Sequence, residues 1–578
     1  MKKIIKIKID DKEVVCPADI SIMEAARKAG IDIPGLCWHP DFEAKANCRI
    51  CVVEIKGRNK LQTSCSTKVE AGMEIRTDTA RVKSARDTNI ELIFAEHIEK
   101  CADCVWRFEC KLLDFADKYK ILITSFKDRK SRRKTYKFAN AVEIDGSQCI
   151  DCRNCIDACG VLQNINYLEL KGKGRQQEVV PTKKKDHHCI LCGQCTVHCP
   201  VSAAQEQTQW EVVEPLLKNK KADKKSKKIL VAQFAPSIRV SIGEDFGLPH
   251  GKLVTGNIVG ALKELGFDYV FDVNFGADIT TMVEAKELME RIEHHKTMPM
   301  MTSCCPAWVN YIELYHPDLI PHLTTVRSPH IHSGGAIKTY WAKKYKINPR
   351  DIVTVSIMPC TAKKYEAIRA EMKIDGNFPV DYVLTTREFS FLMKKNNIDL
   401  AKVKTQKADN PLGEYSGAAA IYGASGGVME SALRTAHHLG CGGKKTGLCH
   451  SRIDFKAVRG MDNVKSALVQ VAGTRLSVAV VNGIGNIEEV IKNLDEYDYI
   501  EVMACPGGCI GGGGQPIPTT PEIRKKRIAA LYKHDKSLKI RKAHDNKGVR
   551  AFLEWLEKQG RKVEHEVLHT KYKKKVKL

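Results

Sequence analysis

The 578-residue sequence lacks any long apolar run, since no stretch approaches the ~20 consecutive apolar residues that cross a bilayer. Its first ten residues alternate lysine with isoleucine, and they lack the apolar centre and small-residue cleavage site of a signal peptide. These absences exclude a membrane-spanning segment and a secretory leader. We therefore expect a cytoplasmic protein whose chain begins with a β-strand.

A nucleotide-binding loop is also absent. The four consecutive glycines at 511–514 do not lie between a strand and a helix in a Gly-x-Gly-x-x-Gly arrangement. The sequence therefore offers no convincing nucleotide or flavin site. We expect these glycines instead to let the backbone pack closely against a metal cluster.

Cysteine, in contrast, is abundant, with 23 in the chain. Ten of these residues lie at Cys-x-x-Cys spacing and nineteen fall into cluster patterns, which indicates metal ligands rather than disulfides in a reducing compartment. Three cysteines fall outside every cluster pattern, and we expect them to be small buried or half-exposed residues. They are Cys16, Cys441 and Cys449.

The sequence TSCCP at 302–306 contains two adjacent cysteines that we expect to have separate roles. Neighbouring side chains point in different directions, so Cys305 can bind a metal while Cys304 stays free for proton transfer. An isolated pair would more often be buried core, but MPCTAKKYE at 358–366 and EVMACPGGC at 501–509 follow it. Together the three motifs offer the four thiolates that a cubane iron–sulfur cluster needs. These are Cys305, Cys360, Cys505 and Cys509.

Residues 1–80 combine strand-like alternation, a short helix beginning near Ser21 and an irregular cysteine loop. This order suggests a β-grasp ferredoxin domain with a 2Fe-2S cluster. A structural zinc would use the same donors, but zinc sites prefer two tight Cys-x-x-Cys knuckles. The four candidate ligands are Cys37, Cys48, Cys51 and Cys65.

Residues 87–113 are amphipathic, and we expect one helix there. A histidine and three cysteines lie in this stretch: His97, Cys101, Cys104 and Cys110. His97 and Cys101 are four residues apart, so a helix would place them on one face. A histidine alone would more often be a surface or core residue.

Residues 141–209 repeat the spacing Cys-x2-Cys-x2-Cys-x3-Cys of the bacterial two-cluster ferredoxins. In that pattern the fourth cysteine of each run binds the other cluster. The repeat predicts an α+β domain with local two-fold symmetry and two 4Fe-4S clusters. One set is Cys149, Cys152, Cys155 and Cys199, and the other is Cys189, Cys192, Cys195 and Cys159.

The formal charge of +24 does not indicate nucleic-acid binding. Five clusters with their thiolates would remove on the order of ten positive charges. Much of the remainder lies in runs at 127–134, 183–185, 218–228 and 571–577, which are typical of solvated linkers and tails. Such runs can also attract acidic partners, as ferredoxins commonly are.

Beyond a linker at 218–228 the pattern becomes α/β. Short apolar strands, such as 352–357 and 476–481, alternate with helical segments such as 258–265 and 283–294.

The three cysteine motifs resemble the signatures TSCCP, MPCxxKxxE and ExMACxxGCxxGGGQP of the iron-only (diiron) hydrogenases. This resemblance implies an α/β catalytic domain of two lobes at 210–578, with the active site between the lobes and a basic C-terminal tail. It also implies an H-cluster, in which the cubane is joined through Cys509 to a diiron unit with carbon monoxide, cyanide and a bridging dithiolate. Dedicated maturation proteins must supply that unit.

The N-terminal regions resemble modules that these hydrogenases share with the large iron–sulfur subunit of respiratory complex I. The resemblance implies a small helical domain at 81–140, in which His97 and three cysteines hold a 4Fe-4S cluster. The expected complement is therefore an H-cluster, one 2Fe-2S cluster and three accessory 4Fe-4S clusters.

The resemblance further implies a proton relay that begins at Cys304. It continues through a glutamate, a hydroxyl, a second glutamate and an arginine, at Glu284, Thr324, Glu287 and Arg291. A helix over 283–294 would align its three members on one face, although the bare pattern is more often a solvated ion-paired stripe. Thr324 stands where serine is common and keeps the hydroxyl.

Other residues match positions around the diiron unit. Lys363 is expected to donate to one cyanide, because a buried anion needs a compensating cation. Pro236 and Ser237 would contact the other cyanide, and Met358 and Met503 would supply polarisable walls.

Two positions depart from the family pattern. His330 stands where glutamine is expected, and Tyr422 where phenylalanine is frequent. Both changes alter the hydrogen bonding available near the distal iron, and His330 could add pH sensitivity.

Three functions follow from these patterns. The first is a hydrogenase that exchanges electrons with ferredoxin. The second is the hydrogen-reacting subunit of an NAD-linked, electron-bifurcating complex whose flavin and nucleotide sites lie on partner chains. The third, a non-catalytic iron–sulfur assembly protein or a hydrogen sensor, is disfavoured because the chain keeps Cys304 and all four cubane ligands.

Overall fold

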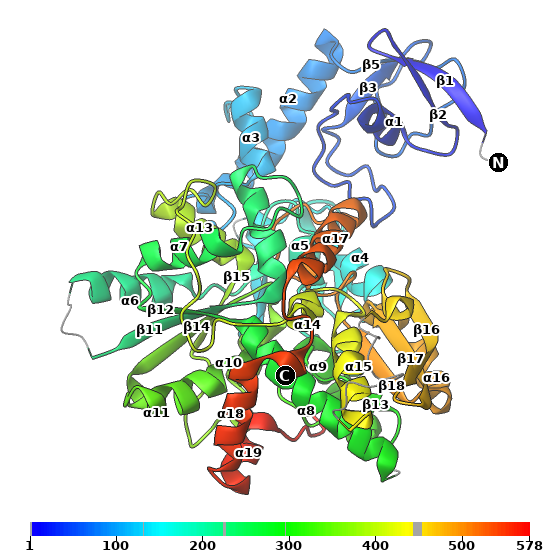
Figure 1. Cartoon of the computed structure of the whole chain (residues 1–578). Coiled ribbons are helices and arrows are strands. Elements are labelled where there is room, and N and C mark those ends of the chain that lie inside the picture. Colours follow the sequence, from blue (N-terminus) through cyan, green and yellow to red (C-terminus); the bar gives the residue numbers. More distant parts are fainter. Residues whose placement is uncertain (1–2, 131, 223–226, 295, 443–453) are drawn as a thin grey trace.

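The computed structural model describes residues 3–130, 132–222, 227–294, 296–442 and 454–578. Its N-terminal part is a sheet in the order β2-β1-β5-β3-β4, which stands apart from the larger body in Figure 1. The strands are β1 (Ile4–Ile9), β2 (Lys12–Pro17), β3 (Val52–Ile55), β4 (Gln62–Thr63) and β5 (Glu74–Arg76). Alternate residues of β1 are buried in one core with α1 (Ile22–Lys28), which Ser21 and Glu24 begin with a capping box. The predicted first strand and helix are confirmed.

The single helix expected over 87–113 is wrong. The chain instead forms α2 (Ala80–Ala95), a 3-10 turn (Ile98–Lys100) and α3 (Lys111–Lys118), so His97 and Cys101 share no helical face. The reason is geometric. A straight helix would spread His97 and Cys110 over about 20 Å, too far apart for one cluster.

Residues 135–206 form a three-stranded sheet in the order β10-β7-β6 and a two-stranded sheet β8-β9. Each cysteine run passes a left-handed residue, Arg153 or Gly193, and enters a short helix, α4 or α5. This agrees with the predicted internal repeat. The elements are β6 (Thr135–Phe138), β7 (Val142–Asp145), α4 (Asn154–Asp157), β8 (Leu168–Lys171), β9 (Glu178–Pro181), α5 (Gln194–Val197) and β10 (Ala204–Glu206).

The expected linker at 218–228 is partly helical. Helix α6 (Trp210–Ala222) includes the first five residues of this segment, 218–222. Residues 223–226 lie outside the described part, and β11 begins at Ile229. Apolar contact explains the difference, since Val213 and Leu217 are buried and the Trp210 ring lies 4.9 Å from that of Phe391.

The remaining chain contains two sheets. The first is fully parallel, in the order β12 (Tyr269–Asp272), β11 (Ile229–Phe234), β14 (Ile352–Met358) and β15 (Tyr382–Thr385). The second has the order β13 (Met300–Met301), β18 (Tyr499–Met503), β17 (Thr474–Asn482) and β16 (Val464–Val471), with only β16 antiparallel to its neighbour. The α/β prediction is confirmed.

Helices surround these sheets (Figure 1). They are α7 (Thr255–Leu265), α8 (Val273–Glu293), α9 (Pro306–Tyr315), α10 (Pro329–Ala336), α11 (Ala342–Lys344), α12 (Ala362–Ala367), α13 (Thr386–Lys395), α14 (Gly417–Ala420), α15 (Gly427–Gly440), α16 (Ile487–Lys492), α17 (Pro521–Ser537), α18 (Lys547–Glu557) and α19 (Arg561–Leu568). None of the helices described has both the length and the apolar character to cross a membrane.

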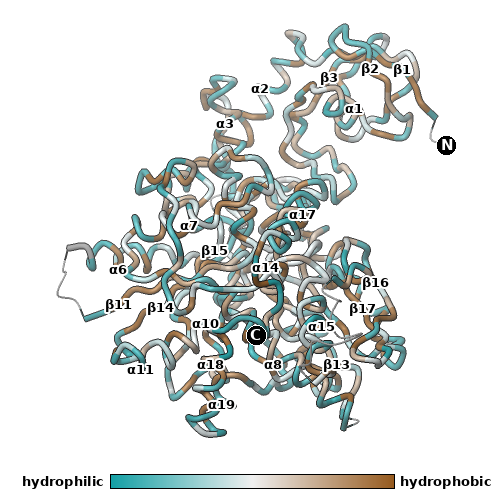
Figure 2. The backbone as a smooth tube through the Cα atoms, in the orientation of Figure 1, coloured by the Kyte–Doolittle hydropathy of each residue, from teal (hydrophilic) through white to brown (hydrophobic). Residues whose placement is uncertain are grey.

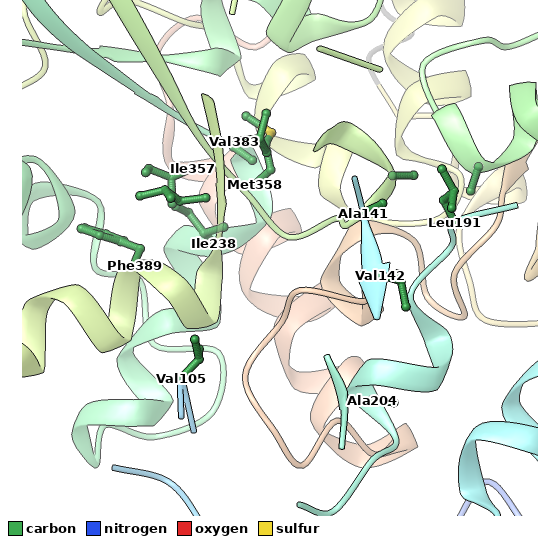
Figure 3. Close-up of a cluster of buried hydrophobic side chains, with 14 of the residues drawn as sticks. Val105, Ala141, Val142, Leu191, Ala204, Ile238, Ile357, Met358, Val383 and Phe389 are labelled. Atoms are coloured by element: carbon green, nitrogen blue, oxygen red, sulfur yellow. The ribbon is translucent and has the colours of Figure 1, made fainter. Parts of the chain in front are cut away.

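One hydrophobic core joins the ferredoxin-like sheets to the first catalytic sheet. Figure 2 shows brown, hydrophobic segments along β11 and β14, inside the body. In Figure 3, Val142 and Ala204 belong to the same buried cluster as Ile357, Val383 and Phe389. Because apolar burial is continuous across the boundary, the ferredoxin-like part is held rigidly against the catalytic part.

A buried ion pair fastens the N-terminal domain to that body. Both carboxylate oxygens of Asp41 accept hydrogen bonds from Arg524 of α17, at 2.9 and 2.7 Å, and His198 Nε2 lies 3.0 Å from Asp41 Oδ2. Ligand atoms of His39, Asp41 and His198 lie within 4.8 Å of one another. Since Arg524 already occupies the carboxylate, we interpret the group as an interdomain ion-pair network rather than a metal site.

Replacing Asp41 with alanine should release the N-terminal domain. The change leaves the Arg524 guanidinium buried without its partner, at a cost of roughly 3–5 kcal/mol. Hydrogen–deuterium exchange and limited proteolysis should show a more open loop at 37–48. Asp11→Ala, which removes an exposed partner of Arg76 in the same domain, is the matched control and should change neither. Unchanged protection in Asp41→Ala would contradict this role.

Candidate active site

The carboxyl ends of parallel strands from both sheets meet at one cavity. Residues that follow β11, β14, β13 and β18 line a cavity of about 720 Å³. Such strand ends are where α/β sheets place their ligands, because the loops leaving them are free to carry functional side chains. Among the sequence-predicted residues at this cavity are Pro236, Ser237, Cys304, Cys305, His330, Met358, Cys360, Lys363, Tyr422, Met503, Cys505 and Cys509.

Four thiols on this wall suit an iron–sulfur cubane. Cys305, Cys360, Cys505 and Cys509 are all free of disulfides. Burial raises the pKa of each thiol, to about 12 for Cys360 and Cys509. A thiol in such a setting becomes a ligand only when a metal replaces its proton, so the donor set fits a cluster and has no evident structural purpose without one.

Cys304 lies beside these thiols and is also buried. Burial raises the pKa of its thiol, and the Glu284 carboxyl raises it further. The Cys304 thiol is therefore disposed to hold its proton in this cavity.

Lys363 is the cation of the cavity wall. Its Nζ donates to the Cys304 carbonyl at 3.1 Å and to Glu366 Oε2 at 2.7 Å. Burial alone would lower the pKa of Lys363, but the Glu366 carboxylate holds it above its ordinary value. A positive charge fixed at an otherwise apolar wall suits an anionic ligand.

The second partner of Glu366 is His330, whose Nε2 lies 2.6 Å from Oε2. Burial, then Lys363, lowers the pKa of His330, so its ring is disposed to be neutral near neutral pH. The Tyr422 hydroxyl is engaged by Thr281 Oγ1 at 2.9 Å, on the side of α8. Both departures from the family pattern therefore have a partner in the protein.

Three of the predicted relay residues, Thr324, Glu287 and Arg291, form one hydrogen-bonded group, and Glu284 lies on the same helix as Glu287. Helix α8 carries Glu284, Glu287 and Arg291, as the spacing predicted, and Thr324 Oγ1 donates to Glu287 Oε2 at 2.9 Å. Arg291 donates to Glu287 Oε1 from Nε at 3.0 Å and from Nη2 at 2.6 Å. Glu287 and Arg291 line a separate open groove rather than the cavity itself.

Glu284 occupies the interior position of this set. It is only 1% exposed, and burial raises its pKa to about 8. Its Oε1 accepts from the Tyr499 hydroxyl, while Oε2 has no protein partner in the described residues. A carboxyl group in this setting holds a proton near neutral pH and has one oxygen free to exchange it.

Sequence reasoning missed Tyr499 and the role of Glu366. Tyr499 lies on β18, two residues before the motif at 501–509. No sequence pattern predicts its contact with Glu284 of α8, which is 215 residues away along the chain. Glu366 belongs to the motif at 358–366, and its position three residues after Lys363 was the sequence signal for their ion pair.

The histidine and three cysteines at 97–110 line one cavity of about 1320 Å³. His97 Nδ1 lies 2.8 Å from the Gln148 carbonyl oxygen, so Nδ1 carries the proton and Nε2 is free to bind a metal. The set therefore fits a metal cluster although the helix predicted to present it is absent.

The ferredoxin-like region brings its cysteines together in the predicted crossed arrangement. Cys159, Cys189, Cys192 and Cys195 line one cavity of about 400 Å³. Burial raises the pKa of the Cys152 thiol, and the Cys199 and Cys149 thiols raise it further. Backbone N–H groups point at several sulfurs, as at Cys159, Cys189 and Cys199, and such donors favour bound thiolate.

This region touches the catalytic cysteine loop. Cys505 Sγ lies 4.0 Å from the Cys192 carbonyl oxygen, and Gln194 Nε2 donates to the Gly511 carbonyl at 3.0 Å. Gly193 has a φ of +68°, and a Cβ there would lie 2.3 Å from Thr361 Oγ1. Glycine is required for so close an approach.

The N-terminal cysteines are buried together, and Cys48 N donates to Cys37 Sγ at 3.5 Å. Among the three cysteines outside the patterns, Cys16 is buried in the N-terminal sheet, as expected. Cys441 is disulfide-bonded, which the sequence did not indicate, and Cys449 lies outside the described residues.

Comparison with known proteins identifies the family. The family model described as iron only hydrogenase large subunit, C-terminal domain, matches residues 228–513. The NADP-reducing hydrogenase subunit HndD of Solidesulfovibrio fructosivorans is 39% identical over 593 residues, which cover 99% of each chain. This chain belongs to the iron-only hydrogenase family. Iron hydrogenase 1 of Clostridium pasteurianum is 38% identical to it over 571 residues, covering 96% of this hydrogenase and 97% of the relative.

A solved structure of an FeFe-hydrogenase HydA1 variant from Chlamydomonas reinhardtii superposes on this hydrogenase with a TM-score of 0.56 at 35% identity. It covers 64% of this chain and 100% of that chain. Further family models, a 2Fe-2S iron-sulfur cluster binding domain and an iron hydrogenase small subunit, match residues 2–80 and 521–575. The predicted enzyme class, an oxidoreductase acting on H2 with iron–sulfur clusters and an H-cluster, is confirmed at this level.

Proposed function

We propose that Cys305, Cys360, Cys505 and Cys509 hold the cubane of the H-cluster and that Cys509 also joins it to the diiron unit. The observation that carries this assignment is one cavity lined by four free thiols, one buried and three half-buried, and by one buried cation, Lys363. When bound, the group supplies an open metal position for H2 and its protons and electrons. The maturation proteins that deliver it are implied partners.

The residues around the cavity have distinct tasks in this proposal. Lys363 and the Pro236–Ser237 corner orient the anionic ligands of the diiron unit, while Met358 and Met503 exclude water. Glu366 holds the Lys363 ammonium in place, since Lys363 Nζ and His330 Nε2 both bond Glu366 Oε2. The site is thus rigid before any ligand binds.

Cys304 begins the proton relay. Its buried thiol exchanges a proton at Sγ, and the Glu284 carboxyl, which holds its own proton near neutral pH, is the next carrier. Thr324 and Glu287 follow, joined by the 2.9 Å hydrogen bond. The Cys304 thiol and the protonated Glu284 carboxyl each have a proton to give, and the Glu287 carboxylate can accept one from Thr324.

Electrons take a separate route through the accessory clusters. We assign the N-terminal cysteines to a 2Fe-2S cluster, the His97 set to a 4Fe-4S cluster and the two crossed sets to two more. The contact between Cys192 and Cys505 supports the last transfer, into the cubane. The corresponding domains are residues 1–80, 81–140, 141–209 and 210–578.

Cys304→Ser should nearly abolish H2 oxidation and proton reduction, because an alcohol holds its proton far more tightly than a thiol does. Iron content per chain and the cluster spectra should stay unchanged, since Cys304 is not a proposed ligand. Cys16→Ser, which removes a thiol buried in the N-terminal sheet, is the matched control and should retain turnover. Substantial activity in Cys304→Ser would contradict the relay.

The electron partner separates two proposals. In the first, ferredoxin is the only electron partner, and the lysine-rich runs of this chain are the candidate surface that binds it. A multisubunit complex with flavin- and NAD-binding chains is the second, and it is favoured by the match to a subunit of an NADP-reducing hydrogenase over 99% of both chains. We retain the cytoplasmic location as a prediction common to both.

Anaerobic native isolation from the source cell distinguishes these partners. If the complex is correct, the chain should co-purify with flavoproteins, and hydrogen uptake should require ferredoxin and NAD together. Ferredoxin reduction by an isolated single chain would instead support the stand-alone enzyme.

A further inference from the structure

The proposed relay ends at Arg291, which is poorly suited to release a proton. A guanidinium cannot be deprotonated in a protein at ordinary pH, so it orients a carboxylate but does not carry protons. Arg291 is 7% exposed. Its other donors bond backbone carbonyls, at 3.2 Å for Thr297 and 2.8 Å for Leu323. Arg291 therefore fixes Glu287 in place. Glu287 lies half-buried at an open groove, where a neighbouring group with a dissociable proton can supply or take its proton.

Glu287 has a second neighbour with a hydroxyl. Thr325 Oγ1 donates to Glu287 Oε2 at 2.9 Å, and the Thr325 backbone N–H lies 3.2 Å from the same oxygen. The hydroxyl of Thr325 also lies 2.8 Å from His569 Nδ1. Because the hydroxyl proton is used toward the carboxylate, Nδ1 must carry a proton and donate to Thr325. The result is a continuous chain of donors from His569 to Glu287.

His569 is held in place by the backbone on both sides. It forms a bridge with Val326, its carbonyl accepts from Arg327 Nε at 2.8 Å, and Thr570 N donates to the Thr325 carbonyl at 2.8 Å. The ring is half-buried and lines an open groove of about 1520 Å³, together with Glu287 and Arg291. A half-buried ring at an open groove has one face toward the relay and access to water.

We propose that His569, through Thr325, is the group that exchanges protons between solvent and Glu287; this inference rests on the proposed relay. Inward transfer begins when a proton from water binds the free Nε2. The Nδ1–H bond then breaks as an O–H bond forms at Thr325, and the original Thr325 proton passes to Glu287 Oε2. One proton enters and one is delivered, and outward transfer reverses each step.

The charges around the ring suit this exchange. Burial lowers the pKa of His569, Glu287 opposes that shift, and His565, Lys286 and Arg327 add to it. The groove also carries Glu290, Lys296, Glu557 and Glu564. With charges of both signs on every side, the imidazole can take and release a proton without a large electrostatic penalty.

Two substitutions test the proposal on the fully matured enzyme. His569→Ala should lower proton-reduction turnover roughly tenfold in dilute buffer at about pH 8, where proton delivery is slowest. Added imidazole, small enough to enter the open groove, should restore it. His569→Asn can keep a donor to Thr325 but cannot carry a proton, so it should show the same loss and the same rescue while preserving iron content and unfolding temperature.

His565→Ala is the matched control. Its ring stacks on His569 with centroids 5.5 Å apart, yet it is exposed and has no hydrogen bond to Thr325 among the described contacts. Turnover should stay unchanged, with no response to imidazole. Thr325→Val removes the link itself, so it should show a loss that imidazole does not restore.

Several results would overturn the proposal. Full turnover of His569→Ala in dilute buffer, or a loss that is independent of imidazole in both His569 variants, would show that protons enter elsewhere. Glu287→Gln separates this inference from the relay on which it rests. If that variant is fully active, the relay itself is wrong, whereas if it is inactive while His569→Ala is normal, only the role of His569 fails.

Discussion

Burial of ionisable groups is the constraint on which the rest of this structure depends. Thiols, carboxyls and one ammonium group lie around one cavity, where burial separates them from bulk water. A buried group keeps its charge only if a partner of opposite charge or a hydrogen bond compensates it. Otherwise it takes its neutral form, so an acid keeps its proton and a base loses one. Glu366 illustrates the first case. Burial opposes its ionisation, but Lys363 and His330 lower its pKa to about 2.

Glu284 illustrates the second case. Among the described residues no cation bonds its carboxyl, so burial raises its pKa to about 8 and the carboxyl retains its proton. Two buried glutamates thus differ in protonation, one an anion bonded by Lys363 and the other a carboxyl that holds its proton near neutral pH. This difference in environment, rather than residue type, separates the ligand-orienting side of the site from the proton-carrying side.

The fold supplies these environments by bringing strand ends from two sheets to one point. Short-range patterns in the sequence predicted much of this, because ligand spacing and helical periodicity are properties of one segment. The crossed sets at 149–199 and the alignment of Glu284 with Arg291 on α8 are examples. The iron-only hydrogenase signatures added the catalytic roles, which spacing alone does not give.

Contacts between distant segments were not predictable in this way. Thr325 and His569 are separated by 244 residues, and Glu284 and Tyr499 by 215. Nothing periodic links such pairs, since their contact depends on how complete elements pack. The prediction of one helix over 87–113 was wrong for a related reason. The amphipathic pattern was real, but helix α2 ends at Ala95 and α3 begins only at Lys111, a break that amphipathic periodicity does not signal.

The central claim is that Glu284 carries a proton between Cys304 and Glu287, and infrared difference spectroscopy tests it most directly. Spectra of the wild-type enzyme should contain a protonated carboxyl band near neutral pH that shifts in heavy water and responds to turnover. The band should be missing from Glu284→Gln and present in Glu290→Gln, which alters an acid of the outer groove. A spectrum without such a band, or one that Glu284→Gln leaves intact, would contradict the account.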